Sequence, residues 1–393
     1  MNLNLWLLAL CQGLFLTNNV TFIAINGLVG LNLAPLGWMA TLPVMGYVVG
    51  GALSTGLVAR TQRLLGRRAS FQLGLAVALG SSLICCYAAY SKNFWLLVMA
   101  TVVAGYYNAN AQLYRFAAAE LALPAFREKA VSLVMAGGLI GAVAGPNLAA
   151  GTRSLTAVPF AGAYLALAGV ALLAMLLLAF IDFPPAPFRA PGAQPSASGR
   201  GMGEIMRQPV FIVAAGAGAL SYGVMNLLMA ATPIAMQICG LPFSDVALVL
   251  EWHVIGMFAP GFFTGHLIKR FGTLPIMAVG LGLNLICVAI ALSGIEFRQF
   301  VGALFLLGLG WNFLFTGSTT LALTAYRPEE KDKAQGALNF CVFAVLAVSS
   351  LASGVLVTTQ GWALLNLGSL LPLGLTGLAL AWLALARRRQ PAA

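Results

Sequence analysis

Two ionisable side chains, Glu251 and His253, lie inside a long apolar stretch of the sequence. Charge is costly at membrane depth, so an ionisable residue there indicates a functional group. Desolvation favours the neutral form of a carboxyl group and imidazole titrates near neutrality, so either side chain could load and release a proton. Positions two apart on a helix differ by about 200°, so the two cannot both face one cavity. Both are candidate proton carriers; an interfacial carboxylate and a hydrogen-bonded packing histidine are the alternatives.

A stripe of polar residues in another apolar stretch has the spacing of one helix face. Its members, four and three residues apart, are Asn108, Gln112 and Arg115. Adding 204 to each number gives Asn312, Thr316 and Thr319. This internal repeat predicts two equivalent helices that line a central binding site, as in transporters built from duplicated halves. Arg115 could attract an anionic substrate, pair with Glu120, or extend its charge to the membrane interface.

Polar side chains in two further apolar stretches have spacings that place them near one helix face. They are seven residues apart in stretch 4–28 and four residues apart in stretch 209–236. Together with the repeated stripes, they give the following expected substrate contacts: Gln12, Asn19, Asn26, Asn108, Gln112, Arg115, Tyr222, Asn226, Trp311, Asn312 and Thr316. Amide groups interleaved with aromatic rings favour a planar, partly polar organic compound. Packing of the aromatic rings against neighbouring helices is the alternative.

Twelve apolar stretches are available to position these residues. Of the 393 residues, 60% are hydrophobic and 8% are charged, a balance that excludes a soluble globular protein. A membrane-spanning helix needs roughly 20 apolar residues. The predicted spans are 4–28, 37–59, 69–90, 94–118, 130–151, 159–181, 209–236, 244–268, 274–294, 298–322, 334–357 and 362–386. We therefore predict an all-α membrane protein with twelve transmembrane helices in two pseudo-symmetric six-helix bundles.

The net charge of +11 reports topology rather than a nucleic-acid partner. If the N-terminus is cytoplasmic, 17 of the 21 basic residues fall on the cytoplasmic side, whereas Lys92, Arg153 and Arg298 fall on the other. Such asymmetry is the positive-inside rule, and it predicts that both termini are cytoplasmic. The expected location is a bacterial-type cytoplasmic (inner) membrane, with the lipid bilayer as partner and no nucleic acid.

One long connection divides the chain. Residues 183–208 are rich in Pro, Gly, Ser and Ala, a composition typical of a linker without a core of its own. The expected domains are a six-helix bundle over 1–182 and a second one over 209–393. The first stretch lacks a basic leader region and is interpreted as a retained helix. The six cysteines show no metal-ligand spacing, so we expect neither a metal nor a cofactor.

The chain resembles the major facilitator superfamily over essentially its whole length. Two basic loops and one helix carry the resemblance. Segments 56–68 and 265–272 look like the family's cytoplasmic G-x-L-x-D-R-x-G-R-R loop, but Arg60 and Lys269 replace its acidic residue. The resemblance implies a latch between the halves, for which Glu120 could supply the counter-ion here. Gly141, Gly145 and Pro146 are similar to the family's drug–proton antiporter signature; physically, small residues four apart permit close helix packing and proline bends a helix. The expected gating residues are Arg60, Arg67, Arg68, Glu120, Gly141, Gly145, Pro146, Lys269 and Arg270.

These features favour a secondary active transporter that works by alternating access as a monomer. Proton-coupled efflux of a small organic compound is the preferred direction, with Glu251 or His253 exchanging the proton. Proton-coupled uptake of an aromatic metabolite or vitamin, such as riboflavin, is the alternative. An intramembrane enzyme would need converging nucleophile, base or metal ligands, and a sensor would carry a soluble domain; neither is evident, so we do not expect an enzyme.

Overall fold

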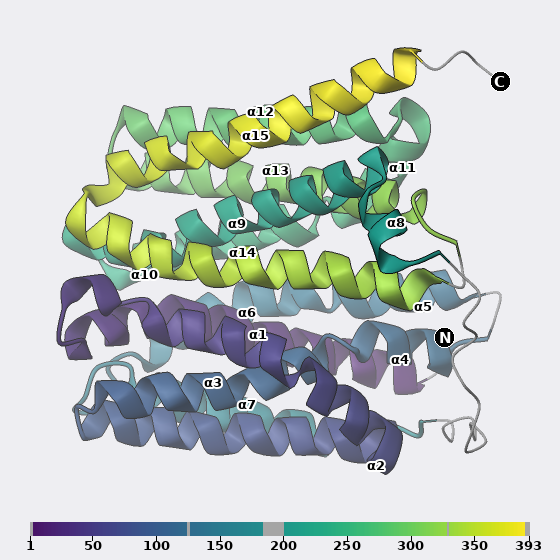
Figure 1. Cartoon of the computed structure of the whole chain (residues 1–393). Coiled ribbons are helices and arrows are strands. Elements are labelled where there is room, and N and C mark those ends of the chain that lie inside the picture. The colour runs from purple at the N-terminus through teal and green to yellow at the C-terminus, as the bar shows by residue number, and fades with distance from the viewer. Residues whose placement is uncertain (1–2, 124–125, 184–199, 328–329, 390–393) are drawn as a thin grey trace.

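The computed structural model describes residues 3–123, 126–183, 200–327 and 330–389, and within them every regular element is helical. The first half contains α1 (Leu3–Leu33), η1 (Gly37–Met39), α2 (Leu42–Tyr90), α3 (Phe94–Ala111), α4 (Tyr114–Leu121), α5 (Arg127–Ala136), α6 (Gly138–Thr152) and α7 (Ala161–Ala179). The second contains α8 (Met202–Met206), α9 (Pro209–Ile238), α10 (Phe243–Phe258), α11 (Gly261–Phe271), α12 (Thr273–Ser293), α13 (Phe297–Leu323), α14 (Lys331–Thr359) and α15 (Gly361–Arg389). Figure 1 shows the two halves side by side, with both chain ends at one end of the helices, here called the termini end.

Nine described segments are long and apolar enough to cross a bilayer, or ten if the bent pair α10–α11 is one span. One of them, Gly37–Tyr90, is a hairpin that reverses at Gly66 rather than a single span. Thr61 and Ser70 are 3.0 Å apart through their hydroxyl oxygens, whereas nine residues of continuous helix would separate them by about 13.5 Å. Counting both arms of α2, and α3 with α4 as another span, gives the twelve predicted crossings.

The hairpin turn corrects the loop expected between the second and third spans. Residues 56–68 are helical except at Gly66, whose φ of 78° and ψ of 174° leave the helical region. Only glycine adopts such a positive φ without steric cost, so the chain reverses at one residue. The arms therefore extend further than the predicted ends at 59 and 69.

Three spans are broken along their length. The α3–α4 break falls at Gln112 and Leu113, the α5–α6 break at Gly137, and the α10–α11 break at Ala259 and Pro260, where the chain bends by 41°. Proline has no backbone N–H to continue the helix, which accounts for the last break. By contrast, α6 continues through Pro146, where the sequence predicts a bend.

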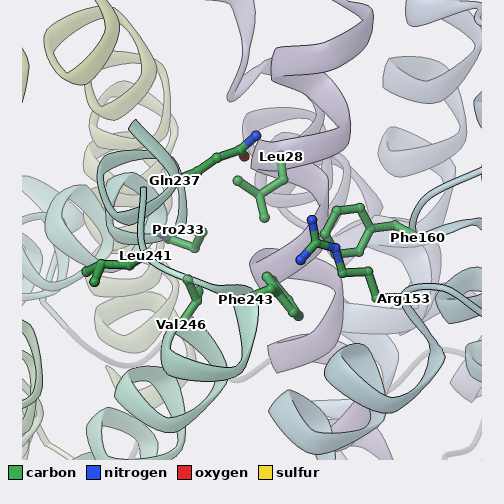
Figure 2. Close-up of a pocket in the computed structure, with 8 residues that line it drawn as sticks. All are labelled: Leu28, Arg153, Phe160, Pro233, Gln237, Leu241, Phe243 and Val246. Carbon is green, nitrogen blue, oxygen red and sulfur yellow. The ribbon is translucent and has the colours of Figure 1, made fainter. Parts of the chain in front are cut away.

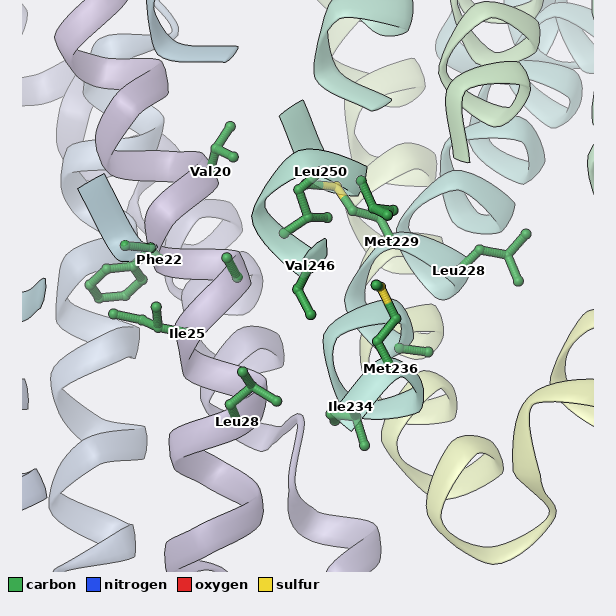
Figure 3. Packing of buried hydrophobic residues seen from close by; sticks show 14 of the residues in the cluster. Val20, Phe22, Ile25, Leu28, Leu228, Met229, Ile234, Met236, Val246 and Leu250 are labelled. Carbon is green, nitrogen blue, oxygen red and sulfur yellow. The ribbon is translucent and has the colours of Figure 1, made fainter. Parts of the chain in front are cut away.

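An apolar seal joins the halves at the end opposite the termini (Figure 3). There Val20, Ile25 and Leu28 of α1 share one buried cluster with Met229 and Ile234 of α9, and with residues of α10. Nearer the termini end three buried clusters each belong to one half, although Phe258 of α10 also packs against the cluster of the first half. A smaller cluster joins Val48 of α2 to Ala219 of α9 and to Val342 and Leu346 of α14. The halves therefore share an extensive buried cluster at one end of the molecule and are also joined by this smaller cluster.

Part of the predicted linker is docked on the second half. Residues 184–199 lie outside the described residues, but α8 follows them and buries Ile205 completely. Just before α8, Arg200 makes a bidentate ion pair with Glu330, with Nη2–Oε2 at 2.7 Å and Nε–Oε1 at 3.0 Å. This part of the connection is structured, which its composition did not predict.

Candidate functional site

Four aromatic rings from three helices of the second half form a cluster. Tyr222 of α9 lies 5.1 Å from Trp311 and 5.2 Å from Phe315 of α13, in both cases edge to face. Trp311 and Phe315 are stacked with their planes at 10°, and Phe258 at the end of α10 lies 6.4 Å from Trp311. The indole Nε1 of Trp311 is buried without a hydrogen-bond partner. The cluster thus offers aromatic faces and one buried donor that is free to bind a polar atom.

The first half contributes a cation to this aromatic cluster. Arg115 of α4 interacts electrostatically with Tyr222, and its Nε is buried without a partner. Its guanidinium stacks 4.9 Å above the ring of Phe116, and among the described residues it forms no ion pair. An uncompensated, half-buried cation favours a ligand with negative or electron-rich groups.

The rest of the polar stripe on the first half lies at the break between α3 and α4. Gln112 is exposed in the turn itself, and Asn108 is half-buried against Gly51 with its Oδ1 unpartnered. Thr316, the repeat equivalent of Gln112, is half-buried on α13 beside Phe315. Asn108 and Gln112 thus have polar atoms available on the first half, and Thr316 directly follows Phe315 of the aromatic cluster.

Two predicted substrate contacts instead hold helices together. Asn312 accepts a 2.7 Å hydrogen bond from Thr264 and donates one of 2.7 Å to the carbonyl of Met257, beside the α10–α11 break. Asn226 donates to Ser349 and Ser350 of α14 at 2.9 and 2.8 Å. The side-chain amides of both residues are therefore bound to neighbouring helices in this conformation.

The three amides of α1 also have different neighbours. Asn19 donates to the hydroxyl of Tyr47 at 3.3 Å, while Asn26 accepts from the hydroxyl of Tyr164 on α7 at 2.7 Å. Gln12 is buried nearer the termini end. Asn19 and Asn26 are therefore bound to different helices, α2 and α7, in this conformation.

Glu251 and His253 point to different partners, as their spacing predicts. Glu251 of α10 accepts a 2.9 Å hydrogen bond from Nδ2 of Asn147 on α6, and Asn147 is held by a 2.7 Å bond to the carbonyl of Val143. His253 is fully buried, and its Nδ1 lies 2.7 Å from the carbonyl of Leu304 on α13. Of the two candidates, only Glu251 makes a hydrogen bond between the halves. Asn147 was not predicted, although it directly follows the Gly145–Pro146 pair.

Two arginines of the basic loop in the first half have partners within that half. Arg67 pairs with Glu120 at 2.5 and 3.0 Å and also donates to Gln62. Arg68 donates to the carbonyl of Ala179, whereas Arg60 is exposed. On the second half, Lys269 and Arg270 are exposed at the end of α11. Glu120 is thus a counter-ion of this loop, as the sequence predicts.

The small residues of α6 permit its close contact with α1. A Cβ at Gly141 would lie 2.5 Å from the Cβ of Leu16 and 2.6 Å from the backbone nitrogen of Thr17. Thr21 donates a 2.8 Å hydrogen bond to the carbonyl of Gly145. These contacts attach α6, and with it Asn147, firmly to α1.

A cation–aromatic clamp closes the sealed end, and sequence reasoning missed it. Arg153 stacks 5.3 Å from Phe160 of its own half and 5.6 Å from Phe243 of the other (Figure 2). The pocket beside them has a volume of about 30 Å³, room for a water molecule but not for an organic compound. In this conformation the sealed end is therefore closed to a substrate.

Comparison with known proteins assigns the family. The model of the Major Facilitator Superfamily matches residues 5–250 and, in a second match, 214–393. The chain belongs to the major facilitator superfamily. Major facilitator proteins of known structure share its fold: the nucleoside transporter NupG has a TM-score of 0.73 at 12% identity, covering 98% of this chain and 99% of NupG. The human organic anion transporter MFSD10 has a TM-score of 0.66 at 15% identity, covering 96% and 100%.

Two curated members of the superfamily are similar in sequence. The riboflavin transporter RfnT of Brucella anthropi is 39% identical over 364 residues, which cover 92% of this chain and 91% of RfnT. The uncharacterized transporter YdeG of Bacillus subtilis is 29% identical over 343 residues, covering 84% and 79%. The chain is thus a multi-pass membrane transporter of the bacterial type.

Proposed function

We propose that this transporter moves a planar heteroaromatic compound of the riboflavin type into the cell by proton-coupled alternating access. The extended similarity to a riboflavin transporter supports the substrate class. Uptake is the alternative direction that the sequence leaves open, and it is the direction expected for a vitamin that the cell uses. The resemblance of α6 to an antiporter signature is the remaining argument for export.

The observation that carries the proposal is the aromatic cluster with its unpartnered donors. A flavin ring would stack beside Trp311, Phe315 and Tyr222, and its carbonyl and ring-nitrogen atoms would accept hydrogen bonds from Trp311 Nε1 and Arg115. Gln112 and Asn108 would bind polar substituents of the compound. Because these groups come from both halves, movement of one half against the other makes or breaks the site.

In the proposed orientation the termini end is cytoplasmic and the sealed end faces outward. The charge distribution supports this orientation. Glu251 exchanges the coupling proton, because its carboxylate lies between the halves whereas His253 is packed against α13. The protein is proposed to act as a monomer without cofactors and to catalyse no chemical reaction.

Uptake of radiolabelled riboflavin into proteoliposomes, with and without an imposed pH gradient, tests the proposal. Wild type is expected to accumulate riboflavin when the outside is acidic. The matched variants are Trp311→Phe in the cluster and Trp252→Phe outside it, on α10, where Trp252 is exposed. If neither riboflavin nor related flavins cross the membrane, the substrate class is wrong. If accumulation occurs only with the opposite gradient, the direction is export.

A further inference from the structure

An apolar groove lies on the membrane-facing side of the first half, away from the proposed substrate site. Its volume is about 480 Å³, and it runs between the two arms of α2 over α3. Its walls include Leu53, Leu57 and Leu73, and Val103 lies in its base. These four side chains are between 39% and 75% exposed. The hydroxyls of Thr61 and Tyr106 in the lining bind each other at 2.8 Å, so the groove presents an apolar surface.

The length of the groove corresponds to one leaflet of a bilayer. From Gly50 to Thr61 the helix rises by about 16 Å, and half of a hydrocarbon core of roughly 30 Å is about 15 Å. The span begins at Leu42, about 12 Å before Gly50, so Gly50 lies near the middle of the membrane. The groove therefore covers the leaflet on the side of the hairpin turn.

A cation lies at the end of the groove where that leaflet meets water. Leu53, Leu57 and Arg60 are four and three residues apart and so share one face of the helix. Arg60 is exposed and has no ion pair among the described residues. Its neighbour Arg67 is bound to Glu120, and Arg68 to the carbonyl of Ala179. Arg60 is thus available to a negative group from outside the protein.

We propose that this groove binds one anionic phospholipid of that leaflet. One acyl chain lies along Leu53, Leu57 and Leu73, and the phosphate binds the guanidinium of Arg60. Basic side chains at the membrane surface attract anionic lipids by about 1 kcal/mol each, which corresponds to about a fivefold preference. Placing the lipid in the cytoplasmic leaflet rests on the proposed orientation, whereas the site itself does not depend on the transported compound.

Native mass spectrometry of the full chain in detergent tests the site with defined lipids. Anionic palmitoyl-oleoyl phosphatidylglycerol is compared with zwitterionic phosphatidylcholine that has the same acyl chains, at equal concentrations. Wild type is expected to retain one phosphatidylglycerol about fivefold better than phosphatidylcholine. Arg60→Gln should abolish the preference, whereas Arg298→Gln, an exposed arginine on the other side of the membrane, should leave it unchanged.

Filling the groove separates binding of the chain from binding of the head group. Val103→Trp and Leu57→Trp should lower the retention of both lipids, whereas Leu172→Trp on the exposed face of α7 should not. Melting temperatures identify a variant that fails to fold. In that case lipid retention by the other groove variant tests the proposal. Glycerol 3-phosphate should not displace the bound lipid.

Four results would overturn the proposal. They are equal retention of the two lipids by wild type, an equal effect of Arg298→Gln, unchanged binding in both groove variants, and displacement by glycerol 3-phosphate. Because none of these measurements involves transport, failure of the lipid site and failure of the proposed function are distinguishable.

Discussion

Asn147 on α6 donates a 2.9 Å hydrogen bond to the carboxylate of Glu251 on α10, and this bond joins the two halves of the transporter. The amide is oriented by its second bond, to the carbonyl of Val143, so it presents a donor rather than an acceptor to Glu251. A donor binds a carboxylate more strongly than a neutral carboxyl group. Protonation of Glu251 is therefore expected to weaken a contact between the halves.

Replacing Glu251 tests its role as proton carrier. Glu251→Gln retains a partner for Asn147 but cannot exchange a proton, so an imposed pH gradient should no longer accelerate riboflavin uptake. Exchange of labelled for unlabelled riboflavin, which moves no net proton, should continue. Asn147→Leu is the matched control, because it removes the bond but retains the carboxyl group and hence the gradient dependence. Gradient-driven uptake that persists in Glu251→Gln would assign coupling to another group, with His253→Gln the next variant.

Glu251 and His253 of α10 show which features of the site can be predicted from the sequence. Helical spacing correctly separates the directions of Glu251 and His253. It does not identify which one faces the other half, because that depends on how α6 and α13 pack around α10. The same limit applies to Asn226 and Asn312: their periodicity places them on the inner faces of helices, but a face that lines a cavity and one that packs on a neighbour have the same period.

The number and order of the spans follow from composition, whereas their breaks do not follow from hydropathy. The twelve stretches are apolar enough to be recognised individually. The turn at Gly66 depends on one backbone angle, and the α3–α4 break falls at Gln112 and Leu113, where no Pro or Gly indicates it. The clamp of Arg153 with Phe243 joins residues 90 positions apart from different halves, so only the assembled fold brings them together.

The indole nitrogen of Trp311 is expected to contribute to substrate binding. Trp311→Phe keeps an aromatic ring but removes the donor, and the loss of one hydrogen bond, about 0.5–1.5 kcal/mol, should raise the Kd for riboflavin roughly 2- to 13-fold. Trp311→Ala also removes the ring stacked on Phe315 and should weaken binding further. Scintillation proximity binding measures both. Unchanged affinity in Trp311→Phe, relative to the Trp252→Phe control, would remove the indole N–H from the site.

The contact between α6 and α1 leaves no room for a methyl group at Gly141. Gly141→Ala would place a carbon 2.6 Å from the backbone of Thr17, so the helices must separate. Overpacking of this kind costs about 1–3 kcal/mol and should lower the melting temperature. Gly151→Ala in the same helix is the matched control, because its added carbon meets nothing within 4 Å. There the more helix-favouring alanine should leave stability unchanged or increase it. Equal melting temperatures for the two variants would contradict the packing shown here.

The ion pair of Arg200 and Glu330 predicts a pH dependence of stability. Hydrogen bonds from Arg200 and from the backbone nitrogen of Arg327 hold the pKa of Glu330 well below its usual range. A carboxyl group whose pKa is depressed by folding stabilises the protein above its unfolded pKa of about 4.3. That stabilisation is lost as the pH falls through the folded pKa. Glu330→Gln should therefore melt below wild type at pH 7, and the difference should narrow below about pH 4.

Differential scanning fluorimetry between pH 7 and pH 3 measures this narrowing. Arg200→Gln removes the other partner of the ion pair. It should also melt below wild type at pH 7, and its difference from wild type should narrow in the same pH range. Arg207→Gln removes an exposed charge after α8 that lies outside the pair, and its melting curve should follow that of wild type at every pH. The ion pair would have no stabilising role if Glu330→Gln and wild type melted together at pH 7. A difference that stayed constant down to pH 3 would instead mean that the side chain stabilises the loop by packing rather than by charge.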